Sequence, residues 1–213
     1  MANVTVKHIL DMIEDQVQDE DNDLWDVQDL LNWYNIGTRT IVGLDPKANS
    51  VIDAVKLVAG VKQAIPAGGI ALVAVYRNMG DDGVTSGRAI TLTSIPSLSS
   101  FYPSWSTETA TEAIYNIMPD SNNKTAYYNY PPSDGAGYVE IEYSKVPTII
   151  VYDEDGDWES AQVGIKEDYV NQLIDYLLHR VYGKDTDIPG NEGKSKMYLA
   201  LFLQGMGVVT PTE

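Results

Sequence analysis

Residues 169–182 read YVNQLIDYLLHRVY, and this stretch decides the fold. Apolar and aromatic side chains recur in it every three to four residues, which is the spacing of a helix that buries one face. The set is wider than the stripe of a surface helix, so we expect a central helix packed on more than one side. Its members are Tyr169, Val170, Leu173, Ile174, Leu177, Leu178, Val181 and Tyr182.

Two more helices are predicted in the first 47 residues. One follows Thr5 and the other follows Asp26, both residue types that cap helix N-termini. Trp25 precedes the second cap as a hydrophobic staple would, and Gly43 and Pro46 mark the end of that helix. The two apolar stripes are Val6, Ile9, Leu10, Ile13 and Val17, then Val27, Leu30, Leu31, Tyr34 and Ile41.

A last helix is predicted to begin at Asn191, as its N-cap, and to stop near Gly205 and Gly207. Its apolar stripe consists of Met197, Tyr198, Leu201, Phe202 and Met206. The simplest assembly of these elements is an antiparallel helical bundle of two N-terminal and two C-terminal helices, formed by residues 1–47 and 151–207. Residues 208–213 lack periodicity and are expected to form an extended C-terminal tail.

Residues 48–150 lack helical periodicity and are predicted to be strands. Short β-branched and aromatic runs alternate with turn residues, for example at 66–69, 119–123 and 131–135. The expected strands are 51–58, 61–65, 70–76, 88–95, 113–118, 125–130 and 138–143. Such spacing favours an antiparallel β-sandwich or barrel-like region, inserted between the two halves of the bundle, and thus an α+β fold.

The charge is strongly acidic, with 31 Asp and Glu against 14 Lys and Arg and a net charge of -17. A protein that grips nucleic acid neutralises phosphates with basic side chains, and this surface would repel them. Two interpretations stay open, a soluble acidic surface or a surface past which DNA slides without binding. The chain has no cysteine, no apolar run long enough for a membrane span and no visible signal peptide, so we expect a soluble protein made in the cytoplasm.

No constellation for catalysis, cofactor binding or metal binding stands out, so no enzyme is expected. The two histidines, His8 and His179, each lie alone on a predicted helix. Asp19, Asp21 and Asp23 match the first ligands of an EF-hand loop, as do Asp153, Asp155 and Asp157, but both stretches lack the required Gly and the final Glu. Residues 190–195, GNEGKS, lack the glycine spacing of a phosphate-binding loop and read as a helix N-terminus.

Tyrosine is the abundant aromatic residue, with 14 copies against two phenylalanines. Tyrosine buries its ring and keeps its hydroxyl in water, which suits a protein interface, although strand propensity alone also favours it. A carbohydrate- or ligand-binding module is therefore an alternative. It would need an exposed aromatic platform near Tyr115, Tyr127, Tyr128 or Tyr130.

The order of these motifs resembles the head-to-tail adaptor proteins of tailed bacteriophages, similar in layout to tail tubular protein A of short-tailed phages. The resemblance extends over about 200 residues, in line with a single-domain length, and is carried by packing and turn positions. They are Val4-Thr5-Val6, 21–25 (DNDLW), 30–35 (LLNWYN), Gly37, Ile41-Val42, Pro46, 58–60, 65–69 (IPAGG), 75–80, 87–90 (GRAI), 127–132, Tyr169, Asp175-Tyr176, 179–182 (HRVY), Lys184-Asp185 and Phe202-Leu203.

The resemblance implies a structural virion protein located in the neck, between the capsid portal and the tail. Such adaptors form a homo-oligomeric ring, commonly of twelve subunits, beneath the portal protein, and present a platform to the tail or the next neck protein. DNA passes through the lumen without specific binding, and no cofactor or membrane is implied. By analogy, the segment that docks on the portal would be Val208, Val209, Thr210, Pro211, Thr212 and Glu213. A tail terminator or another neck protein is the closest rival.

Overall fold

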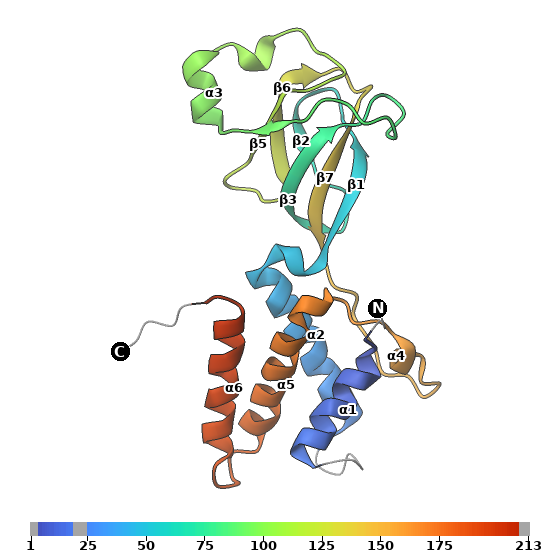
Figure 1. Cartoon of the computed structure of the whole chain (residues 1–213), viewed down its shortest axis with the longest axis vertical. Coiled ribbons are helices and arrows are strands. Elements are labelled where there is room, and N and C mark those ends of the chain that lie inside the picture. The colour runs from blue at the N-terminus through green and yellow to red at the C-terminus, as the bar shows by residue number, and fades with distance from the viewer. Residues whose placement is uncertain (1–3, 19–24, 209–213) are drawn as a thin grey trace. The chain divides into compact units, whose positions relative to one another are not determined.

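The computed structural model describes residues 4–18 and 25–208, which form two compact units (Figure 1). One unit contains the described residues up to Asn49 and those from Pro147 onward, and the other is Ser50–Val146. The described chain is a mixed α+β fold with six α-helices and two β-sheets. The predicted α+β class is therefore confirmed.

The helical unit contains five of these helices. Their bounds are α1 Val6–Val17, α2 Val27–Leu44, α4 Asp157–Ser160, α5 Val170–Lys184 and α6 Asn191–Gly205. Short 3-10 turns stand at Pro46–Asn49 and Glu167–Tyr169. Predicted and observed helices thus agree closely at the two ends of the chain, except for α4, which the sequence did not indicate.

The predicted caps of α1 and α2 are confirmed. Thr5 Oγ1 accepts a hydrogen bond from the His8 backbone N–H at 3.2 Å, and Asp26 Oδ1 accepts one from the Gln28 N–H at 3.0 Å. The predicted cap of α6 is wrong. Gly190, at φ +96°, occupies the N-cap, and the side chain of the buried Asn191 donates to the Asp185 carbonyl at 2.9 Å instead. Because this hydrogen bond engages the Asn191 amide, the side chain satisfies a loop carbonyl in place of the first N–H groups of α6.

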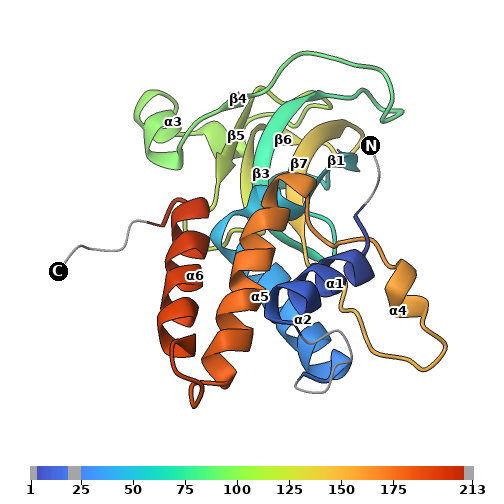
Figure 2. The same cartoon turned by 60° about the horizontal axis from the view of Figure 1, so that its bottom comes forward.

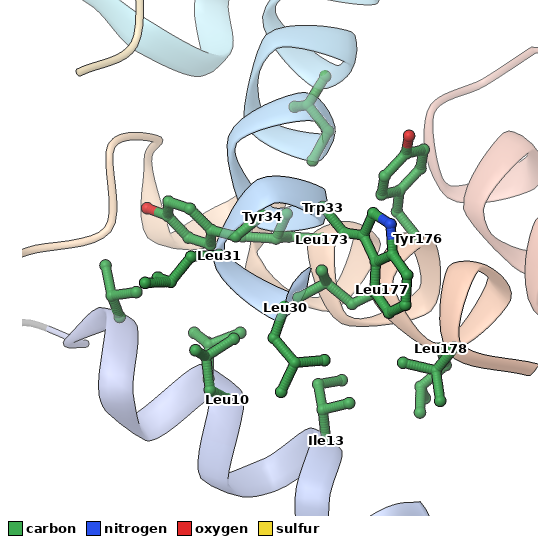
Figure 3. Close-up of a cluster of buried hydrophobic side chains, with 14 of the residues drawn as sticks. Leu10, Ile13, Leu30, Leu31, Trp33, Tyr34, Leu173, Tyr176, Leu177 and Leu178 are labelled. Carbon is green, nitrogen blue, oxygen red and sulfur yellow. The ribbon is translucent and has the colours of Figure 1, made fainter. Parts of the chain in front are cut away.

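The core of the helical unit is built mainly from α1, α2 and α5 (Figure 3). Figure 3 shows Leu10 and Ile13 of α1 pointing toward Leu30 of α2, with Leu177 of α5 close by. All four are at most 1% exposed, as is Leu173. Burial of each such side chain stabilises the fold by roughly 1.5–3 kcal/mol, so this cluster is the main source of helical-unit stability.

Helix α5 packs on more than one side, as its broad stripe predicted. On the α2 side, a Cβ built on Gly37 would lie 2.8 Å from Leu173 Cδ1 and from Tyr176 Cδ1. On the α6 side, a Cβ built on Gly183 would lie 3.0 Å from Ser195 Oγ. These close approaches explain why glycine stands at both places.

Side chains of α2 and of its C-terminal cap hold the returning chain. Asn35 donates to the Ile150 carbonyl at 2.7 Å and accepts from the Ile150 N–H at 2.8 Å. The Tyr34 hydroxyl accepts from the Gly164 N–H at 3.0 Å, and Asp45 accepts from the Tyr169 hydroxyl at 2.5 Å. These side-chain hydrogen bonds join segments that are more than 110 residues apart in the chain, without β-strand pairing between them.

The other unit contains two sheets. The strands are β1 Ser50–Lys56, β2 Gly60–Ala64, β3 Gly69–Asn78, β4 Thr91–Leu92, β5 Asn116–Pro119, β6 Ala126–Ser133 and β7 Tyr138–Lys145. One sheet has the order β1-β7-β3 and the other β2-β6-β5-β4. All neighbours are antiparallel except β4 and β5, which are parallel. Leu57, Ile117, Tyr127, Val139 and Ile141 belong to a core cluster to which both sheets contribute.

The expectation of a barrel-like region is wrong, because both sheets are open. The turn between β1 and β2 also does not make them sheet neighbours. Gln63, which is 4% exposed, explains this difference. Its side chain accepts from the Val58 N–H and donates to the Val58 carbonyl, both at 2.8 Å, so the turn is closed without a β1–β2 ladder. The chain then enters the second sheet.

Two local predictions in this unit are also wrong. The expected strand 88–95 shrinks to β4, and helix α3 (Ile95–Phe101) follows it, capped by Ser94 Oγ on the Ser97 N–H at 3.2 Å. The expected turn at 131–135 begins later, because β6 runs through both prolines to Ser133. Proline has no backbone N–H to donate, but it still has a carbonyl oxygen that accepts. The Pro131 carbonyl accepts from the Asn129 side chain and the Pro132 carbonyl from the Thr111 N–H, so the strand keeps hydrogen bonds at both prolines.

Candidate assembly surfaces

The two histidines are placed differently. His8 is exposed on α1, whereas His179 on α5 is partly buried, with Nδ1 2.9 Å from Ser195 Oγ and 3.1 Å from the Ser195 carbonyl oxygen. A carbonyl only accepts, so Nδ1 carries the hydrogen and donates. The Ser195 hydroxyl in turn donates to the His179 carbonyl at 3.0 Å. A ring nitrogen that donates cannot take a proton from this serine, so the pair joins α5 to α6.

The acidic triplet Asp153, Asp155 and Asp157 lies just before and at the start of α4. There Asp153 Oδ1 accepts from the Asp157 N–H at 3.0 Å, which shapes the turn into that helix. The other triplet, Asp19, Asp21 and Asp23, lies outside the described residues. Within residues 4–18 and 25–208, no group of three or more His, Cys, Asp or Glu side chains is arranged to hold a metal ion.

Residues 190–195 form the start of α6, as predicted. Gly190 supplies the left-handed turn, Ser195 is buried against α5, and the Lys194 ammonium lies 4.7 Å from the ring centre of Tyr182. The lysine and serine of this stretch therefore contact aromatic and backbone groups of the neighbouring helix.

A cation–aromatic cluster on α2 and α5 was not predicted. The Lys184 ammonium lies 2.6 Å from Asp29 Oδ2 and within 5.4 Å of the ring centres of Trp25 and Trp33. The Arg180 guanidinium lies 5.9 Å from the Trp33 ring centre. Asp29, Trp33, Arg180 and Lys184 line a pocket of about 480 Å³. The sequence could have indicated that Arg180 and Lys184 share one face of α5, because they are four residues apart. It could not indicate that tryptophan rings lie next to them, because those contacts form only in the folded chain.

Most of the negative charge lies in the helical unit. Its two segments, 1–49 and 147–213, contain 22 acidic and eight basic residues, whereas Ser50–Val146 contains nine and six. Within the helical unit, residues 147–175 have eight acidic residues against one basic residue, and residues 176–213 have four of each. The chain leading into α5 is therefore strongly negative, and the α5–α6 part is balanced.

The tyrosine-rich region contains both core and surface rings. Tyr127 is 1% exposed, and burial raises its pKa well above the usual value. Tyr128 is partly buried and packs against Trp105. The ligand-binding alternative requires exposed rings, and of these two tyrosines neither is fully exposed.

Tyr102, Tyr115 and Tyr130 contact one another, and we call these three rings, together with the exposed Phe101 that precedes Tyr102 in the chain, the aromatic patch. Tyr102 stacks on Tyr130 at 6.1 Å between ring centres, and Tyr115 meets Tyr130 edge-on at 6.5 Å. Phe101 is 82% exposed. Burial, followed by the nearby Glu108 carboxylate, raises the pKa of Tyr130. The sequence did not indicate Phe101 and Tyr102, because their place at the end of α3 depends on a helix that was predicted as a strand and loop.

Of the predicted portal-docking tail, only Val208 is among the described residues. It is 36% exposed, and its N–H donates to the Leu203 carbonyl at 2.9 Å, which ends the helical chain after α6. Val209, Thr210, Pro211, Thr212 and Glu213 lie outside the described residues. None of the described helices combines the length and the apolar composition needed to cross a bilayer.

A family model described as SU10 adaptor protein matches residues 4–213. The chain belongs to the SU10 adaptor protein family. Membership in this family of phage adaptors implies that the protein is a virion component. The predicted relationship to phage adaptors is thus confirmed, and the narrower likeness to tail tubular protein A stays a prediction. Comparison with curated proteins gives no match.

Proposed function

We propose that this adaptor forms a ring, of twelve copies, beneath the portal protein in the neck of the virion. The ring would extend the DNA channel and provide a platform for the tail or the next neck protein. The observation that carries this proposal is the adaptor family match over residues 4–213. The contacts of the described polar groups point the same way, since the one close His–Ser pair serves to join two helices. We therefore infer a structural role, without catalysis and without a cofactor.

The distribution of charge supports passage of DNA. A channel that binds DNA phosphates tightly would release counterions and retain the strand, whereas acidic walls do not. The helical unit has an excess of 14 acidic residues and the β unit an excess of three, so the helical unit is the better candidate for the lumen wall. We expect the inner surface of the assembled ring to be net negative. A basic lumen in a map of the ring would contradict this expectation.

Docking on the portal is assigned to residues 208–213. Met206 and Gly207 separate this segment from the end of α6, and it starts with the exposed Val208. A variant ending at Gly207 should retain the helical unit, because the last core side chain of α6 is Phe202. The truncated variant should lose portal binding. As a control, its circular dichroism spectrum should match that of the full-length chain, which would show that the helices are retained.

The aromatic patch favours a second candidate function, a carbohydrate- or ligand-binding module. Exposed stacked rings are the usual platform for the apolar faces of sugars, and they also suit protein interfaces. For an adaptor, we assign the aromatic patch to a protein interface, with the tail-side partner as its occupant. Within assembly proteins, a tail terminator or another neck protein differs from the proposal only in its position in the particle.

Native mass spectrometry and electron microscopy test the proposal. The purified chain is measured alone and after mixing with the portal protein encoded by the same genome. A monomer alone and a ring capping the portal is the expected result. A ring found only on a tail tube would indicate a tail terminator, and no binding to either would leave the ligand-binding module, which a glycan array then tests.

A further inference from the structure

Helix α6 is apolar on all its sides in its second half. Residues 197–203 read MYLALFL, an unbroken run of seven apolar residues. A helix that is apolar all round is normally covered on all sides. Here Phe202 is 3% exposed, whereas Met197 is 49% and Leu201 is 43% exposed, although both were expected in the core stripe. Part of this helix therefore has the composition of a buried surface and lies in contact with solvent.

The covered side of α6 faces α5. Phe202 meets Tyr176 with ring centres 5.3 Å apart, and Tyr198 stacks on Tyr182 at 5.8 Å. In both views of the helical unit, α6 lies at one edge, next to α5, and α1 and α4 lie toward the other edge (Figures 1 and 2). Within the helical unit as described, no element lies beyond α6 to cover its outer side.

We call this side the outer face of α6, formed by Met197, Ala200 and Leu201, with Lys194 and Lys196 one turn earlier. Helical geometry places the two lysines on either side of the apolar group. Lys196 pairs with Glu192 at 2.5 Å. Lys194 contacts the Tyr182 ring and forms no ion pair with any acidic group among the described residues. The outer face is thus an apolar surface with a cationic border.

The opposite edge of the same unit has matching properties. Val151 is 67% exposed and Tyr152 is 42% exposed. Directly after them come Asp153, Glu154 and Asp155, beside a hollow of about 280 Å³ between α1 and α4. The hollow is lined by six charged residues, of which five are acidic: Lys7, Asp11, Glu14, Asp153, Glu154 and Glu159. This edge, residues 151–159, is an apolar surface with an acidic border.

We propose that the outer face of α6 docks on the 151–159 edge of a second copy of this chain. Met197 and Leu201 would cover Val151 and Tyr152, and Lys194 would face the acidic border. The proposal rests on the proposed ring and names its lateral contact. Because the two surfaces are different and lie at opposite edges of one unit, the contact is heterologous and repeats from copy to copy until a ring closes. A two-fold contact of two outer faces would instead bring lysine borders together.

The absence of cysteine from the chain makes the test direct, since any thiol is an introduced one. Single variants Leu201→Cys and Val151→Cys are prepared in the full-length chain and treated with a short bismaleimide. They are tested separately and mixed, in free solution at high protein concentration and together with the portal. Both side chains are exposed, so neither substitution removes core packing.

The expected result is a cross-linked dimer in the mixture and little in either variant alone. Dimers of Leu201→Cys with itself would show a two-fold contact and overturn the proposal. Cross-links from Leu201→Cys to the portal alone would assign the outer face to that protein and also overturn it. Absence of any cross-link in every condition would also overturn the proposal. A portal-bound ring without the mixed cross-link refutes this contact and leaves the adaptor function intact, whereas the mixed cross-link without portal binding refutes the adaptor function alone.

Charge reversal gives an independent measurement. We expect Lys194→Glu to weaken copy-to-copy association roughly tenfold, because it places like charges opposite each other across the contact. Glu154→Lys in the partner copy should restore most of the association, because it makes the two charges opposite again. Lys124→Glu, the same change on an exposed loop of the β unit, is the matched control and should have no effect. Equal loss in both lysine variants, or no rescue, would contradict the assignment.

Discussion

Gly37 lies at the closest approach of α2 and α5, and its replacement by alanine gives the sharpest test of the helical core. A Cβ at this position would lie 2.8 Å from carbon atoms of both Leu173 and Tyr176. Carbon atoms in good contact are about 3.5–4.0 Å apart, so the two helices must separate or both side chains must leave their positions. Overpacking of this kind costs about 1–3 kcal/mol.

Gly43 provides the matched control, because it lies on the same helix and has no atom within 4 Å of a built Cβ. Alanine is favoured over glycine in a helix by about 1 kcal/mol, and this gain applies to both positions to a similar degree. The difference between Gly37→Ala and Gly43→Ala therefore isolates the packing cost. We expect Gly43→Ala to be slightly more stable than the parent, and Gly37→Ala to be less stable than Gly43→Ala by about 1–3 kcal/mol.

Urea unfolding followed by tryptophan fluorescence measures this difference. Trp25, Trp33 and Trp158 lie in the helical unit and Trp105 in the other, so the signal reports mainly the affected core. Circular dichroism at 222 nm should give the same order of midpoints. If Gly37→Ala is as stable as Gly43→Ala, α2 and α5 do not approach as closely as described, and the account of the glycine is wrong.

Three further predictions concern other parts of the chain. Asn35→Ala leaves the N–H and carbonyl of Ile150 without their partner and should destabilise the helical unit by about 1–3 kcal/mol in urea unfolding, whereas Asn35→Asp should lose only the donated bond. The hydrogen bond to the Asp45 carboxylate raises the pKa of Tyr169 to about 12, so its contribution to stability is complete below pH 10 and is lost as pH rises toward 12. Tyr169→Phe should therefore flatten the alkaline fall in stability; an unchanged slope between pH 10 and 12 would exclude this pair as its cause. Phe101→Ser, at a side chain 82% exposed, should leave the unfolding midpoint unchanged and weaken attachment of the tail-side partner. Loss of glycan-array binding in this variant would instead support the ligand-binding module.

The helices at both ends of the chain could be predicted because their signals are local. A cap such as Thr5 or Asp26 acts on an N–H group two or three residues away, and an apolar stripe needs only the residues of its own helix. Helix α3 was missed because seven residues are too short for a periodic pattern. The acidic excess and the lack of catalytic motifs were equally visible without coordinates.

Strand pairing could not be predicted, because it depends on partners far away in the chain. Ser50 pairs with Ser144 and Gly69 with Lys145, so β7 lies between β1 and β3. The strand β2, which the predicted turns connected to both, belongs to the other sheet. The side chain of Gln63 closes the β1–β2 turn, and only the folded chain brings its amide to both backbone groups of Val58.

Composition determined that α6 is a helix rich in apolar residues, and the tertiary structure alone decided which of them are buried. Met197 and Phe202 look equivalent in the sequence, since both belong to the apolar stripe predicted for this helix. Packing of α5 against one side covers Phe202 and leaves Met197 at the surface. The physical reason is that local spacing specifies the shape of a helix, whereas burial depends on which neighbours the rest of the chain supplies.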